Sequence, residues 1–332
     1  MKWKFYSLAF VAGMSILTAC SSDDNNDNDG NGGNGNGNEI ENGTILKGTI
    51  TSDVTLAAGN TYKLSGEYIV EEGATLHIEE GVKIIAVYDD IADYILVKQG
   101  GKINAVGTPD KPIVMTSEKE EPGAWGGIHI CGRAHTNAEG GKGSSEIGGA
   151  VYGGNDDADN SGTLQYIRLE YTGFAFDEEH EANGISFYGV GNGTIVDHCQ
   201  AYKGSDDGFE FFGGSVNVSN LVAVSCSDDS FDWTEGWNGK GTNLVAYQED
   251  KSTLGYDCDC LMECDNNGSN NAATPVAHPV LKNLILVGNG GSKQGIRLRA
   301  GTEVEIDNAK VCGKGQPLTV ETALTENALK NG

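Results

Sequence analysis

The stretch that decides the fold is TIVDHCQAYKGSDDGFEFFGG (residues 194–214), followed by VNVSNLVAVSCSDDSFDWTEG (residues 216–236). The two copies match position by position at an interval of 22 residues, so that the pair Asp206 and Asp207 recurs as Asp228 and Asp229. Each copy holds two short segments of alternating apolar residues separated by Gly, Asn, Ser and Asp, which predicts strand, turn, strand, turn. A repeat of this period is typical of a solenoid, in which each unit stacks on the next.

Further copies extend this repeat in both directions. The first segment recurs at residues 164–173, 242–248, 282–288 and 307–313, and the second at 127–132, 184–189 and 295–301. The stretch from residue 66 to 117 shows similar short strands broken by glycine and predicts the first coils, while the stretch from Thr44 to Lys63 is expected to cap the open end against edge-to-edge pairing. The sequence therefore predicts an all-β fold, a parallel β-helix with coils of about 22 to 25 residues.

Alternation within the segments predicts which side chains face the interior. Strands of successive coils stack about 4.8 Å apart, so equivalent residues form ladders. The chain has 49 glycines and only 38% hydrophobic residues, and thin coils filled by such ladders explain how it can still bury a core. The predicted inward ladders are Ile167, Cys199, Leu221, Leu244 and Leu284; Leu169, Ala201, Ala223, Ala246 and Leu286; Ile128, Ile185, Phe209, Phe231 and Ile296; and Ile130, Phe187, Phe211, Trp233 and Leu298.

The first 19 residues predict a secretory signal peptide. Lys2 and Lys4 precede an apolar run from Phe5 to Leu17, which is too short for a membrane-spanning helix. The ending Leu17-Thr18-Ala19-Cys20 resembles a bacterial lipobox. This resemblance implies cleavage before Cys20 and a diacylglycerol on its sulfur, which would attach the mature protein to a membrane.

Residues 20–43 begin with an acidic tract rich in Gly and Asn, which predicts a flexible tether. Acidic residues just behind a lipidated cysteine resemble the surface-export signal of Bacteroidota lipoproteins. The expected location is therefore the outer membrane, with the protein facing the cell exterior. Residues 44–332 remain as a β-helix domain.

Several separate motifs resemble one family of bacterial proteins. They are GGKINAVGTPDKPIVMTS, PGAWGGIHICGRA, NDDADNSGTLQYIRLEYTG and the two Asp-Asp coils quoted above, in this order along the chain. Over about residues 45–315 the chain resembles secreted and lipid-anchored Bacteroidota proteins that are assigned to the pectin-lyase-like right-handed β-helix fold. The resemblance implies the handedness and the location. No settled activity goes with this family, so the function must be argued from the candidate site.

The charge of the chain limits the ligands that it can bind. The formal net charge is −26, and nucleic acids are bound by clustered Lys and Arg rather than by carboxylates. We therefore expect no nucleic-acid partner, whereas cations and neutral ligands such as sugars remain candidates.

The paired aspartates resemble the carboxylates of polysaccharide-cleaving β-helices. Polygalacturonase-type glycosidases carry an adjacent Asp pair, to which SDDGFEF is similar, and a substrate-binding arginine, to which Arg297 is similar. Inverting hydrolysis needs an acid with a raised pKa and a base about 6.5 to 9.5 Å apart, which neighbouring coils could supply. A hydrolase or lyase would use Asp206, Asp207, Asp228 and Asp229.

The sequence departs from this enzyme pattern at three points. The preceding coil presents Ala182 and Asn183 where an aspartate is expected. Asp228 and Asp229 replace the histidine of the following coil, and Arg297 lies three or four coils away. These departures favour a binding protein over an enzyme.

The same carboxylates are candidate metal ligands. Stacking would bring Asp206 and Asp207 next to Asp228 and Asp229, with Glu210 and Asp232 further along each coil, and oxygen ligands at this spacing suit calcium better than zinc. A second candidate is the loop with Asp157, Asp159 and Ser161, which matches the first half of a calcium loop but has Arg168 in place of the final Glu. In the alternative interpretation, the stacked aspartates only cap turns by bonding the backbone.

An outward row of polar residues suggests a ligand-binding face. It comprises His129, Ser186, Glu210, Asp232 and Arg297, and Tyr188, Phe212 and Trp237 are expected beside it. Aromatic rings next to carboxylates are typical of sugar binding, although such a row is also the ordinary polar face of a sheet. The preferred function is binding of carbohydrate or extracellular matrix, with calcium as the candidate cofactor. The alternatives are polysaccharide cleavage and a purely structural or adhesive role.

Seven cysteines remain after Cys20. An odd number in an oxidising compartment leaves at least one thiol free or paired between chains. Cys258, Cys260 and Cys264 form a CxCxxxC cluster that could hold a soft metal, but it lacks paired CxxC spacing and a nearby histidine. The sequence favours disulfide formation or simple packing for these residues.

Overall fold

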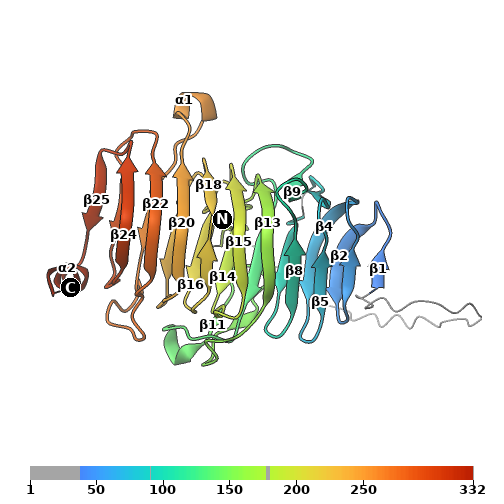
Figure 1. Cartoon of the computed structure of the whole chain (residues 1–332), viewed down its shortest axis with the longest axis horizontal. Coiled ribbons are helices and arrows are strands. Elements are labelled where there is room, and N and C mark those ends of the chain that lie inside the picture. The colour runs from blue at the N-terminus through green and yellow to red at the C-terminus, as the bar shows by residue number, and fades with distance from the viewer. Residues whose placement is uncertain (1–37, 90, 177–179, 332) are drawn as a thin grey trace, which may run out of the picture. The chain divides into compact units, whose positions relative to one another are not determined.

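The computed structural model describes residues 38–89, 91–176 and 180–331. They belong to one unit, in which short strands stack side by side (Figure 1). The predicted signal peptide, Cys20 and residues 20–37 of the predicted tether lie outside the described residues.

The strands of the N-terminal half are β1 (Asn38–Ile40), β2 (Ile45–Ile50), β3 (Val54–Leu56), β4 (Thr61–Val70), β5 (Thr75–Ile78), β6 (Lys83–Ala86), β7 (Tyr94–Val97), β8 (Lys102–Val106), β9 (Ile113–Ser117), β10 (Ile128–Cys131), β11 (Gly143–Ser144), β12 (Val151–Tyr152) and β13 (Gly162–Glu170). The strands that follow are β14 (Ile185–Tyr188), β15 (Ile195–Tyr202), β16 (Phe209–Phe212), β17 (Asn217–Ser219), β18 (Val222–Val224), β19 (Phe231–Thr234), β20 (Lys240–Tyr247), β21 (Met262–Cys264), β22 (Val280–Val287), β23 (Gln294–Leu298), β24 (Glu305–Cys312) and β25 (Gln316–Val320). The helical elements are the 3-10 turn η1 (Glu139–Gly141), α1 (Lys251–Leu254) and α2 (Ala323–Asn331).

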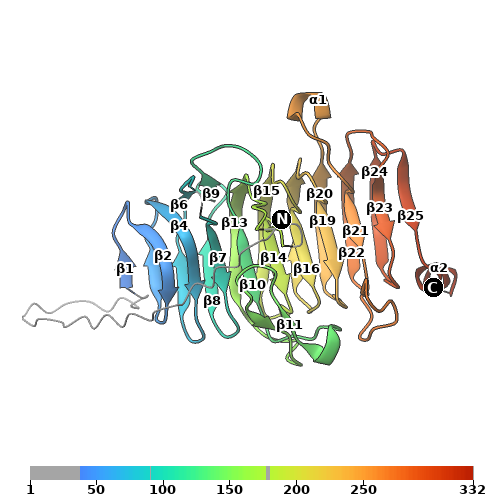
Figure 2. The same ribbon diagram turned by 180° about the vertical axis from the view of Figure 1, so that it is seen from behind.

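Strands one coil apart pair in parallel, which confirms the predicted right-handed parallel β-helix. The predicted interval of 22 residues is also the register in which neighbouring strands pair. Glu210 pairs with Asp232, and Ala201 pairs with Ala223. Figure 2 shows one column of this stack, in which β7, β10, β14, β16, β19, β21, β23 and β25 follow one another. Thr44–Lys63, expected to cap the open end, forms part of the first regular coils, because β2 pairs with β4 and the preceding β1 pairs with β3.

Each central coil has three faces rather than the two segments expected from the sequence. The first segment bends within one strand at a residue with positive φ, and its two halves pair separately with β17 and β18. At this corner Asn220, Asn243, Asn283 and Asn308 have φ of 54°, 58°, 59° and 61°, a conformation that asparagine tolerates well. Their side-chain amides bond one another up the stack at 2.8 to 3.0 Å.

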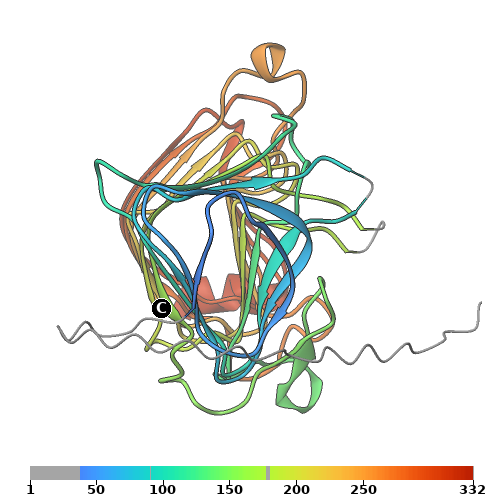
Figure 3. The same cartoon turned by 90° about the vertical axis from the view of Figure 1, so that its right-hand side faces the viewer.

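The interior follows the predicted ladders. All twenty residues expected to face inward are buried, at most 6% exposed. Seen end-on, the coils surround one shared interior (Figure 3). Aromatic rings of neighbouring coils stack, with centroids 5.0 Å apart for Phe187 and Phe211 and 5.6 Å for Phe209 and Phe231. Because like side chains lie in register, the interior gains favourable ring-stacking contacts.

One strand of the stack has no counterpart in the sequence prediction. After β20 the chain makes a long turn over residues 248–261, which includes α1, before β21 pairs with β19 and β23. This stretch lengthens the interval between two copies of the repeat, yet it completes a regular coil. As a result Glu263 stands between Asp232 and Arg297 in the outward row.

Candidate functional site

Nine carboxylates and one arginine line a single cavity of about 250 Å³ on the outer face of the coils. We call this cavity the acidic basin. Its lining residues are Glu146, Glu181, Asp206, Asp207, Glu210, Asp228, Asp229, Asp232, Glu263 and Arg299.

The repeat positions most of these side chains. Asp206 and Asp207 lie in the turn between β15 and β16, and Asp228 and Asp229 lie in the equivalent turn of the next coil. Below these turns the strand residues Glu210 (β16), Asp232 (β19) and Glu263 (β21) form an outward ladder at successive rungs. Stacking thus gathers the six carboxylates predicted from the repeat into one place.

Carboxylate oxygens from different coils lie within reach of one ion. Asp206, Asp207 and Asp228 each offer one oxygen within 4.8 Å of the others, and so do Asp207, Glu210 and Asp232. Asp207 belongs to both sets. Two like charges at this separation repel by about 3 kcal/mol at an effective dielectric constant of 20, so full ionisation of the basin requires counter-charge.

The surroundings supply little of that counter-charge. Arg299 is the cation of the lining, and it pairs with Glu263 and Asp265. Of the remaining polar partners, Asn183 donates its amide to Glu210 at 2.6 Å. The buried Oδ1 atom of Asp232 has no hydrogen-bond partner among the described residues.

Burial therefore dominates the acid-base properties of the basin. It raises the pKa of Asp206 to about 8, with the charge of Asp228 as the next cause, and the pKa of Glu146 to about 7. Burial also raises the pKa values of Asp207, Glu210, Asp229 and Asp232 well above the ordinary range, with neighbouring carboxylates adding to the effect. Such groups either keep protons at neutral pH or take up cations.

The turn-cap interpretation holds for one oxygen of the second aspartate in each pair. Oδ1 of Asp207 accepts a hydrogen bond from the backbone N–H of Asp229 at 2.8 Å. Oδ1 of Asp229 accepts one from the N–H of Cys260 at 2.6 Å. These bonds fix the turns of adjacent coils and leave the second oxygens for other partners.

The structure changes the basis of the enzyme hypothesis. Asn183, which replaces the expected aspartate, accepts a bond from the N–H of Asp207 and holds Glu210. Arg297 is bound to Glu263 and Glu321, so the arginine of the basin is Arg299 rather than Arg297. The carboxylates of Asp206 and Asp228 approach within 4.8 Å, which is too close for the separation that inverting hydrolysis needs.

The prediction that aromatic rings line an exposed binding face is wrong. Tyr188 and Phe212 do point away from the interior, but they are buried in a second apolar cluster with Tyr152, where their rings stack at 4.4 Å. Trp237 lies in the main core and stacks on Phe211 at 4.2 Å. None of the three rings is exposed to stack on a sugar.

The second predicted calcium loop is occupied by protein contacts. Asp157 bonds the ring Nδ1 of His135 at 2.6 Å, and Asp159 accepts a hydrogen bond from Ser161 at 3.2 Å. Arg168, at the position of the missing Glu, pairs with Glu170 on the same strand. These contacts leave the acidic basin as the stronger candidate for cation binding.

The seven cysteines after Cys20 are free in the part of the chain that the structure describes, and only Cys312 is not fully buried. Cys264 and Cys226 point into the core, in agreement with packing. Cys260 differs, because it adjoins the carboxylates of Asp229 and Asp259.

Four residues of the basin were not predicted from the repeat. Glu146 comes from the segment between β11 and β12, and Glu181 from the segment between β13 and β14. Glu263 follows the long turn that disrupts the regular interval. Arg299 directly follows β23, two residues after the predicted Arg297.

Comparison with known proteins agrees with the architecture. The model of a family described as pectate-lyase like beta helix domain matches residues 48–332. No curated protein matches the chain. Among the described helices, none has the length and apolar character required to span a membrane.

Proposed function

The chain belongs to the pectate-lyase-like beta helix domain family, and we propose that its acidic basin binds divalent cations, calcium in particular, through which the domain recognises carbohydrate. Family membership supports a carbohydrate-related role. The observation that carries the proposal is the convergence of nine carboxylates, with one arginine, on a cavity of about 250 Å³.

The chemistry of the basin favours a hard cation. Calcium takes six to eight oxygen ligands in a flexible geometry, and both sets of carboxylates that share Asp207 offer only oxygen. A bound divalent ion also offsets the repulsion that raises the pKa values of these groups. Asp207, Glu210 and Asp232 would hold one ion, and Asp206 and Asp228 would complete a site with Asp207.

The bound cation, rather than the protein side chains, would then contact the carbohydrate. The aromatic rings once expected to stack on sugar are buried, and the net charge of −26 repels acidic polysaccharides. A cation that keeps open coordination positions can bind uronate carboxylates or sugar hydroxyls directly. The cavity is smaller than usual ligand pockets, so only a small part of a polysaccharide would enter it.

The first test measures calcium binding to the full chain by calorimetry after treatment with a chelator. We expect saturable binding and a higher melting temperature with calcium. Asp207→Asn should abolish the high-affinity heat, because Asp207 belongs to both ligand sets. Asp307→Asn, on an exposed side chain, is the matched control and should bind calcium normally. No calcium heat and no change on chelation would refute the cation proposal.

The second test uses an array of acidic and neutral polysaccharides, with calcium and with chelator. Binding that requires calcium supports the proposal. Binding that persists in chelator would separate carbohydrate recognition from the basin. Absence of both calcium and glycan binding would favour the structural or adhesive role.

Polysaccharide cleavage is a second candidate, favoured by the acid-base character of one residue. Because its pKa is raised to about 8, Asp206 carries a proton at neutral pH, as a general acid must. Its distance from Asp228 is closer to the separation in retaining than in inverting glycosidases. Release of reducing ends or unsaturated products that stops in Asp206→Asn would establish this activity.

We also propose that a lipid on Cys20 holds the protein in the outer membrane, with the β-helix facing the exterior. The lipobox-like sequence and the acidic residues behind it support this location. Cys20→Ala should release the protein from the membrane fraction. Protease added to intact cells should digest the wild type if the domain faces outward.

A further inference from the structure

Two neighbouring turns on the rim of the acidic basin are held together by backbone bonds. The N–H of Asp259 donates to the carbonyl of Ser227 at 3.1 Å, and the N–H of Ser230 donates to the carbonyl of Cys260 at 3.2 Å. The bond from the N–H of Cys260 to Asp229 closes the same contact. The side chains on these turns therefore have fixed relative positions.

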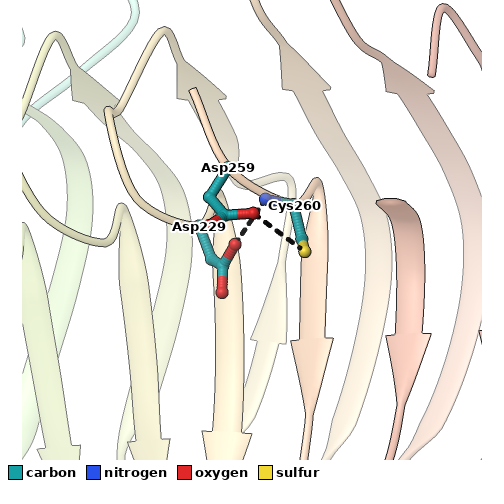
Figure 4. A group of neighbouring side chains, drawn as sticks. All are labelled: Asp229, Asp259 and Cys260. Carbon is teal, nitrogen blue, oxygen red and sulfur yellow. Dashed lines mark hydrogen bonds between the residues drawn. The ribbon is translucent and has the colours of Figure 1, made fainter. Parts of the chain in front are cut away.

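These turns bring one thiol and two carboxylates together (Figure 4). Asp229, Asp259 and Cys260 each offer a ligand atom, and the three atoms lie within 4.8 Å of one another. Cys260 Sγ is 3.3 Å from Oδ1 of Asp259. Cys260 and Asp229 are 1% and 4% exposed, whereas the Asp259 side chain is 26% exposed and provides access from solvent.

The charge around this trio is unbalanced. Burial, followed by the charges of Asp229 and Asp259, raises the pKa of the Cys260 thiol far above its ordinary range. Lys293 pairs with Asp259, but its side chain is 53% exposed. A metal ion at the trio would replace the thiol proton and compensate both carboxylates.

Polar atoms next to the trio also lack partners. Gln248 is 2% exposed and donates its amide to the carbonyls of Asp259 and Cys260, yet its Oε1 has no hydrogen-bond partner among the described residues. The hydroxyl of Ser230, fully buried, is likewise unsatisfied within the described part of the chain. Unsatisfied buried oxygens are costly, and water on a bound metal ion would supply the donors that they lack.

We propose that Asp229, Asp259 and Cys260 form a binding site for a thiol-preferring divalent metal such as zinc. The ligands are Cys260 Sγ as thiolate and one oxygen from each aspartate, with water in the fourth position. Metal binding releases the thiol proton to solvent, and Lys293 can stay on the other oxygen of Asp259, since it pairs with Oδ2 whereas the thiol contacts Oδ1. Sulfur is a poor ligand for calcium, so this site differs in selectivity from the basin, although Asp229 borders both.

Cobalt(II) titration of the full chain tests the site, because cobalt bound to thiolate gives an intense near-ultraviolet charge-transfer absorption. We expect one equivalent of cobalt to produce this absorption and zinc to remove it. Cys260→Ser should abolish the absorption, while Cys312→Ser, on a cysteine outside the core, should preserve it. An absent absorption, or one that survives in Cys260→Ser, would overturn the proposal.

Two further variants keep the test decisive. If Cys260→Ser fails to fold, Asp259→Asn replaces it, because Asp259 is partly exposed and its substitution leaves the backbone contacts in place. This variant should weaken cobalt binding by at least about tenfold, and unchanged affinity would contradict the site. Asp232→Asn, which belongs to the basin alone, should impair calcium binding and leave the cobalt spectrum intact, so the two proposals can fail separately.

Discussion

The interior of the β-helix and the acidic basin are built by the same repeat with opposite energetic results. In both regions equivalent residues of successive coils stack in register, as Phe209 does on Phe231 and Glu210 on Asp232. Inside, stacked rings exclude water and gain contact. In the basin, stacked carboxylates lose hydration and repel one another.

The apolar interior therefore stabilises the folded protein, whereas the acidic basin destabilises it. The apolar ladders need no partner to be favourable. The acidic ladder becomes favourable only when protons or cations bind to it, which is typical of a binding site rather than of a scaffold. The predictions that follow probe this contrast from the largest expected effect to the smallest.

Removal of one ring from the interior should have the largest effect. Phe211 is 2% exposed and lies between Phe187 at 5.0 Å and Trp237 at 4.2 Å. Phe211→Ala should lower the free energy of unfolding by about 3 to 5 kcal/mol, through lost burial and a cavity. Urea unfolding measures this loss, and Phe211→Leu serves as the milder control. A loss below about 1 kcal/mol would mean that the ladder does not carry the stability.

The pH dependence of stability should show the opposite behaviour of the basin. Asp206 and Glu146 have pKa values of about 8 and 7 in the folded protein, against about 4 in an unfolded chain. Because the folded state holds these protons more tightly, their contribution is fully present below about pH 4 and is lost as the pH rises through the folded values.

In chelator, the melting temperature should therefore fall between about pH 5 and pH 8. Calcium should suppress most of this fall, because it binds the ionised carboxylates. A melting temperature that rises with pH in chelator would show that the basin carboxylates are ionised without cost.

Much of the fold could be predicted from the sequence because the interior imposes a strict requirement on it. Only alternating apolar residues at a fixed interval can fill stacked coils. The ladder from Ile167 to Leu284 could therefore be predicted from the sequence, and it is buried as expected. The third face of each coil could not be read, because the bend at residues such as Asn243 lies within one apolar segment.

The candidate site was only partly predictable, because non-repeating segments complete it. The repeat gave Asp206, Asp207 and their counterparts, but Glu146 comes from a segment with no place in the repeat. The same segment contributes Tyr152, which covers Tyr188 and turns a predicted binding face into a core. Alternation distinguishes inward from outward residues, but it does not show what covers the outward ones.

Neutralising one carboxylate of the basin should stabilise the protein in chelator. Oδ1 of Asp232 is buried without a hydrogen-bond partner in the described part of the chain, and Glu263 and Asp265 add repulsion. Asp232→Asn should raise the free energy of unfolding in chelator by about 1 to 3 kcal/mol and weaken calcium binding. Asp307→Asn should change stability by less than about 0.5 kcal/mol. Destabilisation by Asp232→Asn in chelator would mean that the charge is already compensated within the protein.

The smallest effect is expected at the asparagine corner, where like residues stack without charge. Asn243 donates to Asn220 at 2.9 Å and accepts from Asn283 at 3.0 Å, so its amide dipole is satisfied on both sides. Asn243→Gly keeps the left-handed backbone but removes both bonds, which should cost about 1 kcal/mol. Asn243→Ala should cost about 1 kcal/mol more, since its φ of 58° strains a Cβ atom. Equal losses in urea unfolding would assign the effect to the amide bonds alone. A stack of polar residues is therefore stabilising when donors meet acceptors, whereas the basin sets nine carboxylates against one cation, Arg299.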